Sequence, residues 1–90
     1  MHYWRRYPGA IVSAKKNIYV WGKLLGIAFA GKSGNKTASI ASLYLNPLQL
    51  RIADVIAIVP KDKPKNYYPE IAVIDKQTII IKPYIIETKN

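Results

Sequence analysis

Short apolar runs, each closed by a turn, constrain the fold of this chain more than any other feature of its sequence. The runs are rich in Ile, Val, Tyr and Phe, which favour extended backbone. Gly, Pro or Asn interrupts them about every eight to twelve residues. The chain has 90 residues, enough for one small domain only. The pattern therefore predicts an all-β fold, a small antiparallel barrel or sandwich of six or seven short strands.

The first half of the chain is expected to contain a pair of strands and a clear turn. Residues 17–21 (NIYVW) and 24–30 (LLGIAFA) have strand composition, and Gly22-Lys23 between them predicts a tight turn. Residues 31–35 (GKSGN) supply two Gly and an Asn, which tolerate the positive φ values of a hairpin connection. Trp21 and Phe29 lie within apolar runs and are expected in the core.

The segment 36–59 leaves two interpretations open. Residues 36–45 allow either a strand or one short helix. Residues 48–59 (LQLRIADVIAIV) alternate apolar and polar side chains at a period of two, but a helical stripe capped by Asn46 also exists. The β-branched content favours strand, bent at Ala53-Asp54.

The rest of the chain is a loop followed by a hairpin. Residues 60–69 (PKDKPKNYYP) hold three Pro and predict a loop, and residues 70–82 predict a hairpin that turns at Asp75-Lys76-Gln77. The expected organisation is a basic-aromatic N-terminal arm over 1–10, a single β-domain over 11–86 and a polar tail over 87–90.

Charge is the strongest compositional indication of a partner. Fourteen Lys and Arg oppose five Asp and Glu, which gives a formal net charge of +9. Such a field favours polyanions. It predicts a nucleic-acid-binding protein, with RNA favoured, that is a structural component of a nucleoprotein assembly. One alternative is a merely soluble Lys-rich surface. Another is a virion or other assembly subunit that self-associates or binds proteins through an edge strand in the Ile-rich segments 78–81 and 84–86.

The candidate nucleic-acid-binding residues lie in an aromatic arm and in three basic loops, where rings would stack on bases and cations would contact phosphates. They are Trp4, Arg5, Arg6, Tyr7, Lys15, Lys16, Lys32, Lys36, Lys61, Lys63, Lys65, Tyr67 and Tyr68. For the arm, an alternative is that Trp4 and Tyr7 fold back as a lid on the core.

The segment GIAFAGKS, residues 26–33, has the written form of a phosphate-binding loop. That motif needs a strand before it and a helix after it, whereas here an apolar run fills the interval and Gly34-Asn35 follows. Nucleotide binding through 26–33 is therefore only a remote alternative to a basic turn.

Catalysis, cofactors and metal ions are not expected. The chain has no Cys, its one His is His2, and its carboxylates are scattered among lysines. The apolar stretch 39–59 is interrupted by Asn46, Pro47, Gln49, Arg51 and Asp54, so no membrane span is expected. The N-terminus lacks the features of a secretory signal, which predicts a cytoplasmic protein.

Overall fold

The computed structural model describes residues 2–3, 11–59 and 68–84. All regular structure in these residues is β, with no helix, so the all-β prediction is confirmed and no short helix lies within 36–59. The strands are β1 (His2–Tyr3), β2 (Ile11–Ser13), β3 (Ile18–Leu24), β4 (Ile27–Ala30), β5 (Ile40–Leu45), β6 (Gln49–Ile52), β7 (Val55–Ile58), β8 (Glu70–Asp75) and β9 (Thr78–Pro83).

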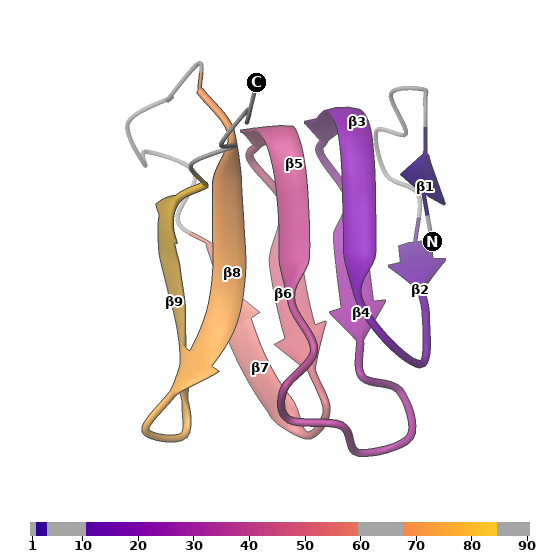
Figure 1. Cartoon of the computed structure of the whole chain (residues 1–90), viewed down its shortest axis with the longest axis vertical. Helices are drawn as coiled ribbons and strands as arrows, with labels where there is room; N and C mark the ends of the chain where they lie inside the picture. Colours follow the sequence, from indigo (N-terminus) through magenta and orange to yellow (C-terminus); the bar gives the residue numbers. More distant parts are fainter. Residues whose placement is uncertain (1, 4–10, 60–67, 85–90) are drawn as a thin grey trace, which may run out of the picture.

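The strands form two sheets that lie face to face (Figure 1). One sheet has five strands in the order β1-β3-β5-β8-β9, and the other has four in the order β2-β4-β6-β7. In the part of the chain that the structure describes, the two sheets do not join into a closed barrel. Of the two predicted architectures, the sandwich is therefore the nearer.

From β1 to β6 the chain alternates between the two sheets, and strand neighbours within each sheet are parallel. Ile18 pairs with Ile40 and Ile27 with Gln49, so the chain returns to the neighbouring parallel strand of the same sheet after 22 residues at both places. We call the part of the chain from β1 to β6 the coiled half, and each such return one coil. The prediction of an antiparallel fold is wrong for this half. Period-two alternation identifies a strand and its buried face but says nothing about which strand pairs with it.

Two connections predicted for the coiled half differ from those in the structure, because consecutive strands there belong to different sheets. Gly22-Lys23 is not a turn, because β3 continues through it to Leu24 with a register shift between Val20 and Lys23. The turn at 31–35 is present, with positive φ at Gly31 and Gly34, but it joins strands of different sheets rather than a hairpin. Gly31 has no room for a side chain, because a Cβ there would collide with the backbone oxygen of Asn35.

The second half of the chain is antiparallel, as predicted. Residues 48–59 are extended rather than helical, as predicted, but they form two strands and not one bent strand, because β6 and β7 make a hairpin that reverses at Ala53-Asp54. Ile56 and Ile58 are therefore exposed, whereas Leu50 and Ile52 are buried. β8 and β9 form the predicted C-terminal hairpin, in which Lys76 and Gln77 both have positive φ. β8 also pairs with β5 and so attaches this hairpin to the coiled half.

Alternate side chains of both sheets fill the space between them. The largest fully buried residues are Ile18, Leu24, Ile40, Leu45, Leu50 and Ile52. Small Ala28 and Ala30 lie beside them and let the sheets approach closely. No helix in the described ranges is long and apolar enough to cross a membrane. The same residues contain no group of three or more His, Cys, Asp or Glu that could hold a metal ion.

Candidate functional site

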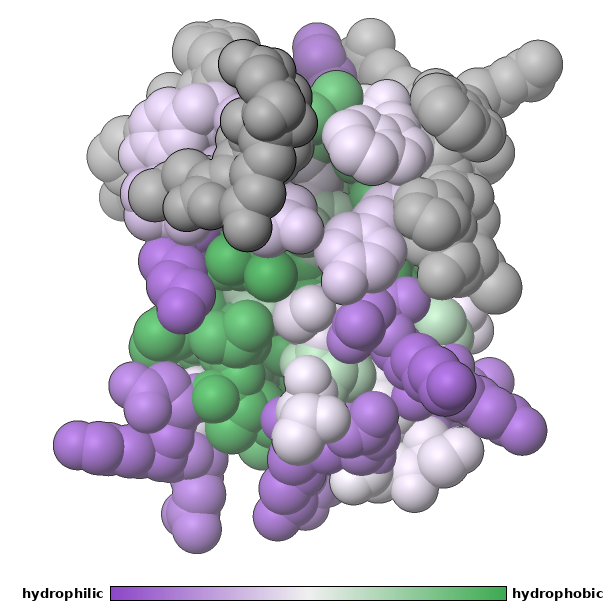
Figure 2. Space-filling view, viewed as in Figure 1, coloured by the Kyte–Doolittle hydropathy of each residue, from purple (hydrophilic) through white to green (hydrophobic). Residues whose placement is uncertain are grey.

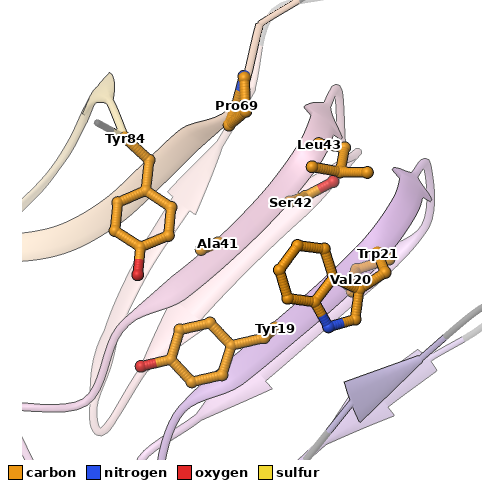
Figure 3. Close-up of a pocket in the computed structure, with 8 residues that line it drawn as sticks. All are labelled: Tyr19, Val20, Trp21, Ala41, Ser42, Leu43, Pro69 and Tyr84. Atoms are coloured by element: carbon orange, nitrogen blue, oxygen red, sulfur yellow. The ribbon is translucent and has the colours of Figure 1, made fainter. Parts of the chain in front are cut away.

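An apolar pocket of about 240 Å³ lies on the outer face of the five-stranded sheet (Figure 3). It is lined by Tyr19, Val20, Trp21, Ala41, Ser42, Leu43, Pro69 and Tyr84. Figure 3 places the rings of Tyr19 and Trp21 along β3 and the ring of Tyr84 across the floor from them. The walls are therefore aromatic, and they come from segments far apart in the sequence.

The alternation of β3 explains why aromatic rings reach the surface. Ile18 and Val20 point into the core, so Tyr19 and Trp21 point outward. On the neighbouring strand Ala41 pairs with Tyr19, and its short side chain leaves the floor of the pocket open. Trp21 is 43% exposed, so its predicted core position is wrong. The apolar run around Trp21 predicted a core position because the composition of a run does not show which of its side chains point outward.

A bulge in β3 positions the pocket's Trp21. The register shift between Val20 and Lys23 leaves a kink that β5 must accommodate. The buried hydroxyl of Ser42 lies 2.8 Å from the Gly22 carbonyl oxygen and 2.9 Å from that of Tyr44, and accepts the Tyr44 N–H at 3.1 Å. Its single hydrogen serves the two carbonyls, and the hydroxyl thereby satisfies backbone groups that the bulge removes from the strand ladder.

Apolar surface extends beyond the pocket on this face. Figure 2 shows hydrophobic residues gathered over the β8–β9 side, with hydrophilic residues around them. Val73 and Ile80 form a cross-strand pair there, and Ile80 is exposed. A shallow apolar pocket within such a face is suited to receive a side chain of another protein. Among the described residues that line the pocket there is no His, Cys or carboxylate, so they offer no acid, base or nucleophile of those types.

The outer face of the four-stranded sheet is also apolar. Two rows of paired residues cross it: Ile11, Ile27, Gln49 and Ile58 in one, and Ser13, Phe29, Arg51 and Ile56 in the other. Ile11 is 72% and Ile58 78% exposed. We call this surface the Arg51 face, because Arg51 is the single charged residue in its four strands.

Arg51 is held in place on the Arg51 face. Its guanidinium lies 4.5 Å from the centre of the Phe29 ring, which belongs to the outer face and not to the core as predicted. The Nε atom is buried without a hydrogen-bond acceptor. A partly desolvated guanidinium on an aromatic ring is an oriented and unsatisfied donor.

Four of the lysines predicted to bind nucleic acid are brought together at one corner. The Gly31 N–H donates to the Lys16 oxygen and the Lys32 N–H to the Ala14 oxygen, which joins the turn after β2 to the turn after β4. All four lysines are exposed there: Lys15, Lys16, Lys32 and Lys36. Tyr68 is 45% exposed and belongs to a different segment, just before β8. Trp4, Arg5, Arg6, Tyr7, Lys61, Lys63, Lys65 and Tyr67 lie outside the described residues.

The phosphate-loop motif has the wrong structure for a nucleotide. Residues 27–30 of it are β4, with Ala28 and Ala30 fully buried, and the segment after Ser33 is a turn followed by β5. Its apolar interval is needed by the core, so it cannot curl around a phosphate. The remote alternative of nucleotide binding through 26–33 is therefore wrong.

Comparison with known proteins places the chain in a family. Residues 7–84 match the family described as septum formation inhibitor MinC, C-terminal domain. A probable septum site-determining protein MinC of Prochlorococcus marinus subsp. pastoris is 68% identical over 79 residues, which cover 88% of this chain and 36% of that protein. The corresponding protein of Nostoc sp. is 50% identical over 74 residues, 82% of this chain and 20% of that protein.

A solved structure has the same fold. A chain of the MinC:MinD cell division protein complex of Aquifex aeolicus superposes with a TM-score of 0.77 and 38% identity, over 82% of this chain and 60% of that chain. The present chain spans about a third of the length of several of the curated relatives it matches.

Proposed function

Because the chain belongs to the family of the C-terminal domain of the septum formation inhibitor MinC, we propose that it is a protein-binding domain that acts in septum placement by docking a MinD-type protein. The observation that carries the proposal is the likeness, at 38% identity, to a chain of a MinC:MinD complex. Two apolar outer faces, one with an aromatic pocket, are consistent with a domain that works by docking. A cytoplasmic location forms part of this proposal.

The family corrects the function predicted from charge. The chain is not an RNA-binding component of a nucleoprotein assembly, nor a virion subunit that acts through strand edges, because its relatives are septum site-determining proteins. Net charge describes how a surface attracts polyanions in general and does not identify the biological partner. The prediction that the chain is not an enzyme is confirmed, since the family is described as an inhibitor of septum formation.

The proposal is tested by titrating the purified chain with the MinD protein of the same organism and measuring the dissociation constant by calorimetry. We expect saturable binding that a nucleic acid competitor does not displace. A chain that stays folded but shows no heat of binding and no co-sedimentation with MinD would exclude the proposal.

A second candidate function is self-association through the pocket face, favoured by the exposed Trp21 and Leu43 beside an apolar hollow. Burial of an aromatic ring and neighbouring aliphatic side chains is the usual centre of such a contact. Sedimentation equilibrium of the isolated chain tests it. We expect a dimer that Trp21→Ser converts to a monomer; a wild-type monomer at high concentration would rule it out.

A further inference from the structure

We propose that the Arg51 face is the surface that docks the MinD-type partner, and that Arg51 receives a carboxylate of that partner at its centre. This inference rests on the proposed function and adds to it the surface and the chemistry of recognition. Each of the two apolar outer faces carries a cation stacked on an aromatic ring, but among the described residues only Arg51 has a buried side-chain donor without a hydrogen-bond partner.

The charge pattern of the Arg51 face specifies an acidic group. The four strands contain no Asp or Glu, and Arg51 is their only charged residue. Across the strands its neighbours are Phe29 and Ile56, neither of which can accept a hydrogen bond from its side chain. A partner that covered this face with purely apolar residues would bury an unpaired guanidinium, which is strongly unfavourable. A partner that brings a carboxylate satisfies it.

The stacked geometry makes Arg51 a suitable receptor. The Phe29 ring at 4.5 Å fixes the plane of the guanidinium, so less side-chain entropy is lost when a carboxylate binds its fork of N–H donors. Nε is already shielded from water without an acceptor. Exclusion of water by the surrounding isoleucines strengthens the resulting charge-assisted bonds. Ile11, Ile56 and Ile58, all more than half exposed, supply the apolar surface around them.

The opposite sheet provides a matched control. Lys23 lies over the Tyr44 ring, 5.4 Å from its centre, on the outer face of the five-stranded sheet. It is also a cation stacked on an aromatic ring of the neighbouring strand, so Lys23→Leu removes a similar group from the other face.

The experiment measures the affinity of the wild-type chain, Arg51→Leu, Arg51→Lys and Lys23→Leu for the MinD protein of the same organism. We expect Arg51→Leu to weaken binding at least tenfold. Arg51→Lys should retain part of the affinity, because lysine keeps the charge but not the planar fork. Lys23→Leu should bind as the wild type does. Thermal unfolding establishes that each variant is folded, and Arg51→Leu should be no less stable than the wild type, since it removes an unsatisfied buried donor.

Each outcome distinguishes the surface from the function. Wild-type binding with an unchanged Arg51→Leu overturns the Arg51 face while the proposed function stands. An equal loss in Arg51→Leu and Lys23→Leu also overturns it, because general charge would then explain the binding. A change of self-association in Arg51→Leu with an unchanged affinity for MinD assigns the face to a second copy and overturns the inference. Absence of wild-type binding removes the proposed function itself.

Discussion

At the scale of single residues, the Ser42 hydroxyl illustrates how one polar atom makes an irregular strand possible. Replacing Ser42 with Ala leaves the Gly22 oxygen and the Tyr44 N–H without the partner that now satisfies them. The loss of a buried hydrogen-bond partner costs about 1–3 kcal/mol. We expect Ser42→Ala to lower the free energy of unfolding by that amount in urea titration. Ser33→Ala, the same change in an exposed turn, should stay within about 0.5 kcal/mol of wild type.

The two glycines of the β4–β5 turn should respond differently to substitution, although both have positive φ. At Gly34 an added Cβ meets no atom within 4 Å, so Gly34→Ala carries mainly the backbone cost of about 1–2 kcal/mol. At Gly31 the Cβ collides with the Asn35 backbone oxygen as well. We expect Gly31→Ala to lose at least twice as much stability as Gly34→Ala in denaturant titration. Equal losses would indicate that the turn relaxes freely.

At the scale of elements, the β8–β9 hairpin turns through two residues poorly suited to their conformation. Lys76 and Gln77 have φ of 52° and 69°, values that Asn and Gly adopt at lower cost in a two-residue hairpin loop. The double replacement Lys76→Asn, Gln77→Gly should raise the free energy of unfolding by about 1 kcal/mol. The urea midpoint should rise with an unchanged m-value. The control is Lys36→Asn. Lys36 does not have a positive φ, so this substitution should leave the urea midpoint unchanged within error.

The elements also mark where sequence reasoning succeeds. The C-terminal hairpin was predictable because its strands are adjacent in the chain, and the turn residues lie between two clear period-two runs. Residues 48–59 were predictable as extended from the same period-two alternation, but the reversal at Ala53-Asp54 that makes them a hairpin was not. The coiled half was not, because β3 and β4 are consecutive yet belong to different sheets. Their pairing partners, β5 and β6, lie a full coil away, and the paired rows hold different residues, such as Tyr19 with Ala41 and Phe29 with Arg51.

At the scale of the whole molecule, the candidate site could not be predicted because it depends on how distant strands are placed in the two layers. Trp21 and Phe29 stand in apolar runs like those of core residues, and only the placement of both strands in a two-layer fold turns them outward. The basic residues were conspicuous in the sequence, and the structure does bring four lysines to one corner. Charge nevertheless predicted the wrong class of partner, since apolar faces spread over several strands are invisible to composition.

The two outer faces lie on opposite layers of the molecule, so their functions should separate in single variants. Trp21→Ser removes an aromatic wall of the pocket, and Ile58→Ser removes the most exposed isoleucine of the Arg51 face. Both side chains are outside the core, so melting temperatures should change little. We expect Trp21→Ser to abolish self-association in sedimentation equilibrium while its affinity for MinD changes less than twofold. Ile58→Ser should weaken MinD binding several-fold and leave self-association intact, as loss of a docked aliphatic side chain does. If either variant impaired both measurements, the two faces would form one coupled interface, because a contact confined to one layer cannot sense a surface substitution on the other.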